Sequence, residues 1–234
     1  MITLTFSHDG WYGSSGRVQL LDDEFEVDDE HAGQARVRAV RELIDPWNWV
    51  RNFRAATDYL AVEPGVDPSR LGAWGTSFGA GTALYCASTD DRFGALVVQA
   101  GFMETPPEEM RAYARHRASE IARGEIAPFP FVDAFPGFTG ALNVARMQHY
   151  DPVAAVDRLT APTLIMDAAK EELFDIGKSG GRVHELLAQR GDIDVVYDVI
   201  PNIDHYAIYS EGFPHSSAAA LDWYGRYLTH TRGE

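Results

Sequence analysis

The sequence contains a single cysteine, Cys86, among its 234 residues. An internal disulfide framework is therefore impossible, and the chain has no cluster of Cys and His residues that would bind a metal. No apolar run reaches the length that spans a bilayer, and the first residues lack the basic-then-apolar order of a signal peptide. These absences favour a cytoplasmic protein that uses neither a metal nor another cofactor.

Basic residues are also scarce, since 20 Lys and Arg residues stand against 35 Asp and Glu residues, for a formal net charge of −15. An acidic surface repels nucleic acid phosphates and anionic lipid headgroups, so we expect neither nucleic acid nor a membrane as a partner. The composition, 45% hydrophobic and 24% charged, is ordinary for a globular protein with one sizeable core. We expect one domain that carries an insertion.

One glycine-rich stretch contains the pattern Gly-x-Ser-x-Gly, with its serine at Ser77. Residues 69–72 before it favour a short buried strand, and the small apolar residues 80–87 after it favour a helix. A serine at the apex between a strand and a helix is the geometry of a nucleophile elbow. Because strand and helix pass closely there, we expect a Cβ at Gly75 or at Gly79 to collide with the neighbouring backbone. A glycine-rich turn with an incidental serine is the alternative, and the matching flanks favour the elbow.

Strand-like and helix-like segments alternate along most of the chain, which predicts a mostly parallel sheet with helices on both faces, the α/β class. Strands are predicted at residues 1–6, 69–72, 94–99, 161–166 and 194–200. Helices are predicted at residues 34–60 (with a break near 45–46), 80–87, 104–126, 181–189 and 216–228. At the break, Asp45 before Pro46 fits an N-cap followed by proline in the first turn of a helix.

The alternation is interrupted between about residues 103 and 160, and this segment is predicted to be an inserted lid over a pocket. Within it, residues 127–140 are rich in phenylalanine, proline and glycine. A helical excursion with an irregular loop would fit the same pattern, but clustered phenylalanines favour a hydrophobic lid and hint at an apolar or aromatic acyl group. The phenylalanines predicted to line the pocket are Phe129, Phe131, Phe135 and Phe138.

A serine nucleophile needs a base within hydrogen-bond reach, and the base needs an acid that orients it. After an elbow the expected chain order is serine, then Asp or Glu, then histidine. His205 lies in the loop directly after the last predicted strand, where the base is expected. The later histidines outside that loop are predicted on helices or in the tail: His184, His215 and His230.

The acid is expected in the loop after the predicted strand at residues 161–166. Asp167 is close enough to the strand to point into the sheet, and Asp175 fits a cap at a helix start. Two glutamates remain, Glu171 and Glu172, and we prefer Glu171.

Together these motifs resemble the α/β-hydrolase superfamily, in the branch of dienelactone-hydrolase-like and prolyl-oligopeptidase-like serine hydrolases. The resemblance runs from residue 1 to about 228 and is weakest across the lid. It implies that Glu171 is the acid, because the family's acid falls nine positions after the proline that opens the strand. It also implies that the backbone N–H of Phe78 is an oxyanion donor. The matching runs are Leu71-Gly72-Ala73-Trp74-Gly75-Thr76-Ser77-Phe78-Gly79, Asp91-Arg92-Phe93-Gly94-Ala95-Leu96-Val97, Ala161-Pro162-Thr163-Leu164-Ile165 through Glu171, and Asp204-His205-Tyr206.

Two features depart from the family pattern. Where the family usually has Asp-x-Arg-Gly after the strand that residues 1–6 resemble, this chain has Ser7-His8-Asp9-Gly10. The family's first three strands, and the loop that supplies a second oxyanion donor, have no counterpart, so we expect either a truncated chain or a reduced architecture. An unpaired edge strand invites pairing with a second copy, which predicts a homodimer. His8 and Tyr12 are candidates to replace the missing donor.

The sequence therefore predicts a serine hydrolase that cleaves an ester, or a related acyl bond such as an amide, of a small apolar molecule by means of Ser77, His205 and Glu171. Trp74 and Tyr206, together with the lid phenylalanines, are predicted to contact the substrate. The same triad would support cleavage of a carbon–carbon bond beside a carbonyl, or cyclisation by acyl transfer. A non-catalytic binding or scaffold protein on a degenerate hydrolase fold is the remaining alternative, which the intact triad disfavours and the missing oxyanion loop favours.

Overall fold

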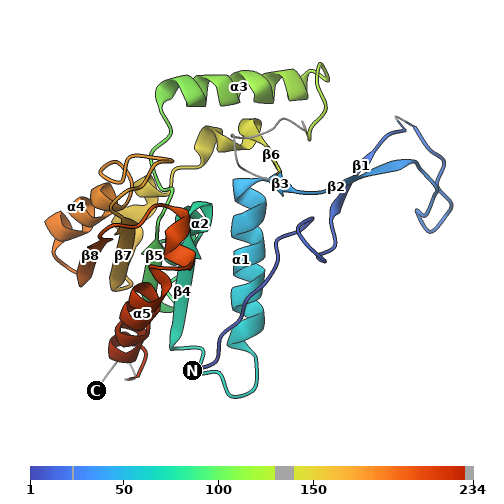
Figure 1. Ribbon diagram of the computed structural model, residues 1–234. Helices are drawn as coiled ribbons and strands as arrows, with labels where there is room; N and C mark the ends of the chain where they lie inside the picture. Colours follow the sequence, from blue (N-terminus) through green and yellow to red (C-terminus); the bar gives the residue numbers. More distant parts are fainter. Residues whose placement is uncertain (23, 130–139, 230–234) are drawn as a thin grey trace. The chain divides into compact units, whose positions relative to one another are not determined.

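The computed structural model describes residues 1–22, 24–129 and 140–229 (Figure 1). The chain divides into two compact units. The first unit comprises Met1–Leu4, Phe53–Pro107 and Tyr150–Glu234, and the second comprises Thr5–Asn52 and Glu108–His149. The elbow sequence belongs to the first unit, and most of the predicted lid belongs to the second.

The first unit is built on a sheet of four strands in the order β4-β5-β7-β8. All three neighbouring pairs are parallel, which confirms the predicted sheet type. The two middle strands are buried along their whole length, which is why their sequences are continuously apolar rather than alternating. The strands are β4 (Leu71–Thr76), β5 (Phe93–Gln99), β7 (Thr163–Ala168) and β8 (Val195–Ile200).

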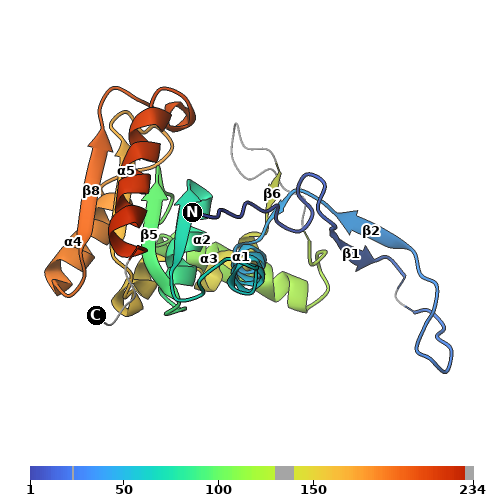
Figure 2. The ribbon, with the colours of Figure 1, turned by 90° about the horizontal axis from the view of Figure 1, so that it is seen from below.

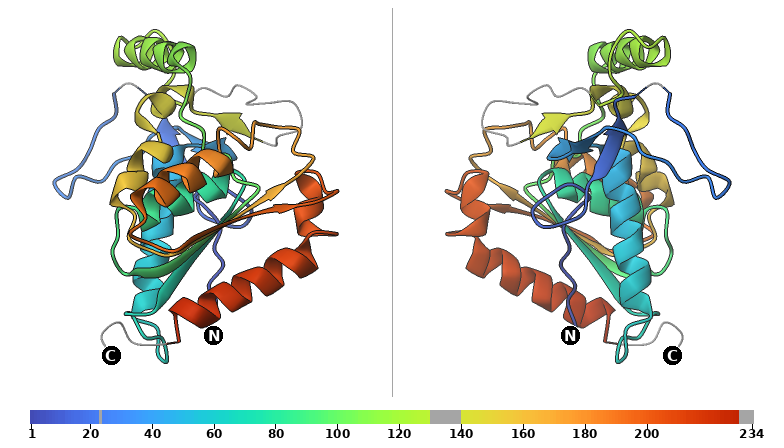
Figure 3. Two further views of the ribbon diagram at one scale, coloured as in Figure 1. Left: turned by 90° about the vertical axis from the view of Figure 1, so that its left-hand side faces the viewer. Right: turned by 90° about the vertical axis from the view of Figure 1, so that its right-hand side faces the viewer.

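Helices cover both faces of this sheet (Figure 3). On one face lie α2 (Phe78–Ala87) and α4 (Gly180–Arg190), and on the other lies α5 (Phe213–Tyr227), which Figure 2 shows extending across β5. Trp223 and Tyr224 of α5 pack against the apolar side chains of β5 and β7. The predicted α/β architecture with helices on both faces is therefore confirmed.

The turn between β4 and α2 has a strained backbone. Ser77 has a φ of 55° and a ψ of −126°, a region that residues with a Cβ rarely adopt. Its N–H donates to the carbonyl of Gln99 at 3.1 Å, and its carbonyl accepts the N–H of Phe102 at 3.0 Å. These two backbone bonds hold the apex of the turn against the end of β5.

Close packing explains one of the two elbow glycines. A Cβ at Gly75 would lie 2.3 Å from the carbonyl oxygen of Gly79, so this position accepts only glycine without a shift of the backbone. A Cβ at Gly79 would meet nothing within 4 Å. The predicted collision at Gly79 is therefore wrong, because only the strand residue directs its Cβ position into the crossing.

Residues 1–6 form no strand, contrary to the prediction, and their side chains are exposed. A strand needs a neighbour that accepts its backbone hydrogen bonds, and none of the strands in the described part of the chain pairs with these residues. Among the described strands, β4 pairs only with β5, so it lies at an edge of the sheet. The homodimer stays a prediction.

Residues 34–45 are extended rather than helical. β2 (Val37–Val40) pairs in antiparallel fashion with β1 (Arg17–Leu20), and β3 (Leu43–Ile44) pairs in parallel with β6 (Ala141–Leu142). The β-branched residues of this segment suit strands, and pairing within the second unit outweighs the helical periodicity.

Helix α1 (Pro46–Ala61) begins after the predicted break. Asp45 Oδ1 accepts the N–H of Asn48 at 3.1 Å, which confirms the N-cap. The Asp45 carboxylate is buried and also lies 3.4 Å from the guanidinium of Arg17 and 3.5 Å from that of Arg146. It therefore ties the start of α1 to two other parts of the second unit.

The inserted segment supplies further elements of the second unit. Helix α3 (Glu108–Ala122) packs against the 3₁₀ helix η1 (Val144–His149). The Trp47 ring N–H donates to the carbonyl of Arg146 at 2.9 Å. The single domain with a lid at about 103–160 stays a prediction. Within the described ranges, no helix combines the length and the hydropathy needed to cross a membrane.

The glycine geometry makes a matched pair of predictions. Gly75→Ala should lower the free energy of unfolding by about 1–3 kcal/mol or more, because β4 or α2 must move to admit the methyl group. Gly79→Ala should be neutral or stabilising, since alanine favours a helix over glycine by roughly 1 kcal/mol. Urea unfolding followed by circular dichroism measures both. Equal stabilities of the two variants would contradict the one-sided crossing.

Candidate active site

Three loops at the carboxyl ends of parallel strands bring Ser77, Glu171 and His205 together in the first unit. Ser77 follows β4, Glu171 follows β7 and His205 follows β8. Parallel strands end at the same edge of a sheet, so side chains from distant parts of the sequence meet there. This edge is where the three side chains predicted to form the site come within hydrogen-bond distance.

His205 bridges the other two side chains. Its Nδ1 lies 2.7 Å from Oε2 of Glu171, and its Nε2 lies 3.1 Å from Oγ of Ser77. The side chains of His205 and Glu171 are each 2% exposed, so water competes little for these bonds. A carboxylate at Nδ1 favours the tautomer with its proton on that nitrogen, which leaves the Nε2 lone pair directed at the serine hydroxyl. We call these three residues the hydrogen-bond relay.

The two neighbouring glutamates bond to different atoms of the loops. Glu171 reaches the imidazole ring, and its Oε1 also accepts the N–H of Leu173 at 3.0 Å. Glu172 is exposed, and its Oε2 accepts the backbone N–H of His205 at 3.2 Å. The first glutamate therefore contacts the ring, and the second supports the loop that carries it.

Aromatic rings surround the imidazole. Phe174 and Tyr206 contact the His205 ring edge-on, with centroid separations of 5.7 Å and 5.1 Å. Phe102 lies 5.8 Å from Phe174 and stacks with Phe78 at 6.3 Å. We call these four residues the aromatic cluster: Phe78, Phe102, Phe174 and Tyr206. The arrangement gives an apolar group bound near Ser77 flat surfaces to contact.

The sequence singled out two members of this cluster, Tyr206 and Phe78, the latter only for its backbone N–H. It did not single out Phe102 or Phe174, because loop residues show no periodicity. Their positions in the sequence could have indicated that they lie at the site, since each follows the carboxyl end of a sheet strand, where functional residues gather.

The Trp74 side chain lies on the face of the sheet that α5 covers and makes no ring contact with His205. Its ring lies 6.4 Å from that of Tyr224 in α5, and a Cβ at Gly72, two residues earlier, would also meet Tyr224. Strand side chains alternate between faces, so Trp74 points to the face that α5 covers. The substrate contact predicted for it stays a prediction.

Of the four predicted lid phenylalanines, one lies among the described residues. Phe129 belongs to the second unit, where it packs against Val40, Leu43 and Ala141, and the Arg17 guanidinium lies 5.0 Å from its ring centroid. Its predicted role in a pocket stays a prediction. Three phenylalanines and one tail histidine lie outside the described residues: Phe131, Phe135, Phe138 and His230.

The two candidates for a replacement oxyanion donor also belong to the second unit. The His8 ring stacks on Trp49 with a centroid separation of 4.3 Å, and burial lowers the pKa of His8 to about 4. A histidine with this pKa is neutral near pH 7. Tyr12 is 84% exposed. Their predicted role as donors stays a prediction.

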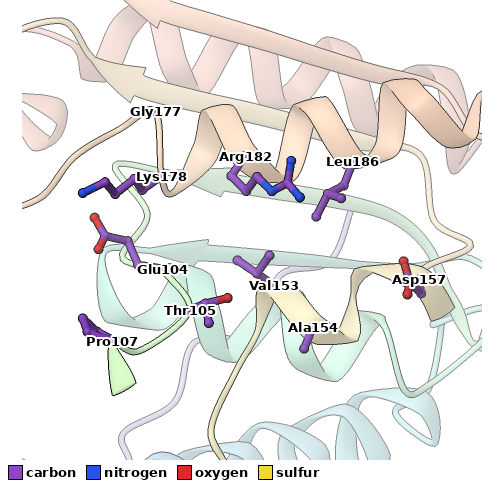
Figure 4. Close-up of a pocket in the computed structure, with 10 residues that line it drawn as sticks. All are labelled: Glu104, Thr105, Pro107, Val153, Ala154, Asp157, Gly177, Lys178, Arg182 and Leu186. Carbon is purple, nitrogen blue, oxygen red and sulfur yellow. The ribbon is translucent and has the colours of Figure 1, made fainter. Parts of the chain in front are cut away.

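The first unit has a separate groove of about 490 Å³ (Figure 4). It lies between the start of α4, the 3₁₀ helix η2 (Val153–Arg158) and residues 104–107. Lys178 and Arg182 lie on one side, and Val153 and Leu186 contribute apolar surface. No residue of the relay lines this groove. Among the described residues, no group of three or more potential ligands would hold a metal ion.

Residues 46–231 match the prolyl oligopeptidase family, a stretch that makes up most of the sequence. The chain belongs to this family. Family membership confirms the resemblance found in the sequence and places the Ser77 elbow in a family of hydrolases.

Three curated proteins show similarity to parts of the chain. The quorum-quenching protein AidA of Acinetobacter baumannii is 36% identical over 64 residues, 27% of this chain and 21% of AidA. The thiohydrolase aneE of Aspergillus aculeatus is 29% identical over 99 residues, 38% of this chain and 31% of aneE. The polyketide transferase af380 of Aspergillus fumigatus is 25% identical over 197 residues, 67% of this chain and 68% of af380. The matches thus span less than two thirds of the first two relatives.

Solved structures confirm the fold. The structure of DcsB in complex with its substrate analogue has a TM-score of 0.66, with 17% identity, and the match covers 82% of this chain and 77% of DcsB. The α/β hydrolase GrgF from a Penicillium species has a TM-score of 0.61, with 12% identity, and the match covers 83% of this chain and 76% of GrgF. The chain therefore has an α/β-hydrolase fold.

The different contacts of the two glutamates generate a prediction. Glu171→Gln should lower kcat by about 10⁴, as amide replacement of a triad acid does, because the amide favours the wrong imidazole tautomer. Glu172→Gln should have little effect, since its amide oxygen still accepts the backbone N–H. Steady-state kinetics on a nitrophenyl ester compares them. A larger loss for Glu172→Gln would show that the acid is Glu172.

Proposed function

We propose that this chain is a serine hydrolase that cleaves an ester, or a related acyl bond, of a small apolar substrate through an acyl-enzyme. The observation that carries the proposal is the relay, with its separations of 2.7 Å and 3.1 Å from Glu171 through His205 to Ser77. Membership of the prolyl oligopeptidase family supports it.

The reaction begins when Oγ of Ser77 attacks the substrate carbonyl while Nε2 of His205 takes the hydroxyl proton. Glu171 holds the ring and stabilises the imidazolium that forms. When the carbonyl reforms, the leaving alcohol takes the proton from Nε2 and the acyl group stays on Ser77. A water molecule then repeats the sequence, with His205 as its base, and releases the acid.

The negative charge on the tetrahedral intermediate needs donors that are already in place. The backbone N–H of Phe78 is the proposed donor, because this residue directly follows the nucleophile and is the first of α2. The N-terminus of a helix carries a partial positive charge, which favours an oxyanion there.

The aromatic cluster supports an apolar or aromatic group on the substrate. Phe102, Phe174 and Tyr206 come from the loops after β5, β7 and β8, which surround the relay. Flat apolar side chains gain most from contact with a flat apolar ligand.

Acyl transfer is a second candidate function. One relative, the polyketide transferase af380, is named for a transfer, and its match spans 67% of this chain, while the thiohydrolase aneE is named for a hydrolysis. The relay would act on a thioester as on an oxygen ester, and a hydroxyl in place of water would make the second step a transfer or a cyclisation. Product analysis by mass spectrometry, with an added alcohol as acceptor, separates hydrolysis from transfer.

The nucleophile is tested with a fluorophosphonate probe. The native chain should be labelled, and peptide mapping should place the label on Ser77, because only a serine activated by a base attacks phosphorus quickly. Ser77→Ala should lose both labelling and esterase turnover. Ser119→Ala is the control, since this exposed serine of α3 donates only to the carbonyl of Arg115. Labelling of a folded Ser77→Ala protein at the native rate would contradict the proposal.

Substrate contact is tested by removing one ring at a time. Phe174→Ala should raise KM for a benzoyl or butyryl ester roughly fivefold more than for an acetyl ester, since about 50 Å² of lost apolar contact is worth roughly 1 kcal/mol. Steady-state kinetics with matched esters measures the ratio. Phe129→Ala tests the pocket role that the sequence predicts for that ring. If the KM of every ester rises equally in Phe174→Ala, the aromatic cluster is packing rather than a binding surface.

A further inference from the structure

A second carboxylate, that of Asp167, lies buried close to the relay and has no part in the reaction described above. Asp167 stands near the end of β7, four residues before Glu171, and its exposed fraction is 0%. A carboxylate without contact with water is costly unless donors surround it. Its partners therefore indicate what it does.

The two oxygens of Asp167 accept hydrogen bonds from different elements, the segment after β5 and strand β8. Oδ1 accepts the backbone N–H of Gly101 at 3.3 Å, and Oδ2 accepts the phenol of Tyr197 at 3.0 Å. The start of α4 closes over the carboxylate, because a Cβ at Gly180 would lie 2.1 Å from Oδ2. The carboxylate thus joins the segment after β5 to β8 and α4.

The segment after β5 is hydrogen-bonded to the backbone of Ser77. Gly101 is fixed on both sides, since its carbonyl accepts the hydroxyl of Ser179, which in turn accepts the N–H of Met103 at 2.9 Å. Between them, the N–H of Phe102 donates to the carbonyl of Ser77 at 3.0 Å. Asp167 is therefore connected to Ser77 in two steps. Its carboxylate accepts the N–H of Gly101, and the next residue, Phe102, donates its N–H to the carbonyl of the strained serine.

We propose that Asp167 is a positioning residue for the reaction at Ser77. Its ionised carboxylate holds Gly101, and Gly101 places both the N–H that holds Ser77 and the Phe102 ring that stacks with Phe78. The inference rests on the proposed function, because it assigns a role in that same site.

The charges around Asp167 make this role depend on pH. Burial raises the pKa of Asp167 to about 6, the bonds from Tyr197 and Gly101 lower it, the negative charge of Glu171 raises it, and His205 lowers it. The start of α4 contributes only Ser179 and Gly180 at this point, neither of which is charged. The carboxyl group therefore titrates in the range where a hydrolase works.

The raised pKa also means that ionisation of Asp167 destabilises the fold. A carboxyl group whose pKa is higher in the native than in the unfolded chain contributes stability at low pH and loses it as the pH rises through about 6. A residue that serves only the fold gains nothing from this charge. A residue that serves the reaction retains its charge although the charge lowers the stability of the fold.

The test is Asp167→Asn in the full chain. Asparagine keeps the size, an oxygen for the Gly101 N–H and a donor for the Tyr197 oxygen, and it removes the charge. We expect kcat for a nitrophenyl ester to fall by about 10- to 100-fold. We expect the native chain to show an ionisation near 6 in the acid limb of its pH profile, and the variant should lose it. The melting temperature should be at least that of the native chain at about pH 7.5, with the difference shrinking toward about pH 4.5.

Two further variants complete the test. Tyr197→Phe removes a bond that lowers the pKa of Asp167, so its acid limb should move to higher pH. This variant keeps the proposal testable if Asp167→Asn fails to fold. Asp198→Asn is the matched control on β8, the strand that carries Tyr197. The Asp198 carboxylate lies 2.6 Å from Nε2 of His215 and makes no contact with the relay, so kcat and the pH profile should stay native.

The outcomes separate the inference from the proposed function. If the fluorophosphonate probe fails to label the native chain, the proposed function is wrong. If the native chain is labelled and a folded Asp167→Asn protein keeps the native kcat and acid limb, only the positioning role is wrong. An acid limb that does not move in Tyr197→Phe would also overturn it.

Discussion

The close crossing of β4 and α2 at Gly75 is the constraint on which the site depends. With the carbonyl oxygen of Gly79 2.3 Å from any Cβ at Gly75, strand and helix touch, and the chain must reverse within one residue. Ser77 makes that reversal with a φ of 55°, at the carboxyl edge of the sheet and at the first turn of a helix. Because this crossing fixes the position of Ser77, the side chains of His205 and Glu171 can contact it only from loops at the same edge of the sheet.

Strain and buried charge then accumulate in one small region. Ser77 is strained, the Glu171 side chain is 2% exposed and Asp167 is fully buried, and each condition reduces stability by itself. Every one of them is held by a hydrogen bond from a neighbouring loop, so the loops after β4, β5, β7 and β8 depend on one another. These loops extend from a sheet whose middle strands are buried along their whole length.

The parts of the fold that sequence could predict are those with a local cause. The strands β5, β7 and β8 and the elbow follow from apolar runs and glycine spacing, and of these strands β5 and β7 are buried along their whole length. Residues 1–6 failed as a strand and residues 34–45 as a helix, because pairing partners elsewhere in the chain decide such segments. In the site, the meeting of Ser77, Glu171 and His205 could be predicted from their positions in the loops after the strands. The ring contacts of Phe102 and Phe174 could not, since loop residues become neighbours only through the fold, whereas the inward direction of Asp167 was expected from its place at the end of the strand.

Water access bears on the choice between hydrolysis and acyl transfer. Both reactions share the acyl-enzyme, and they differ in whether water or another nucleophile reaches it. Tyr206, which contacts the His205 ring, is 52% exposed, and Leu173, whose N–H bonds to Glu171, is 42% exposed. The side chains of His205 and Glu171 are buried, whereas these two neighbours face solvent. The exposure of these two side chains in the described part of the chain supports the proposed hydrolysis, because solvent beside the imidazole supplies the water that releases the acyl group.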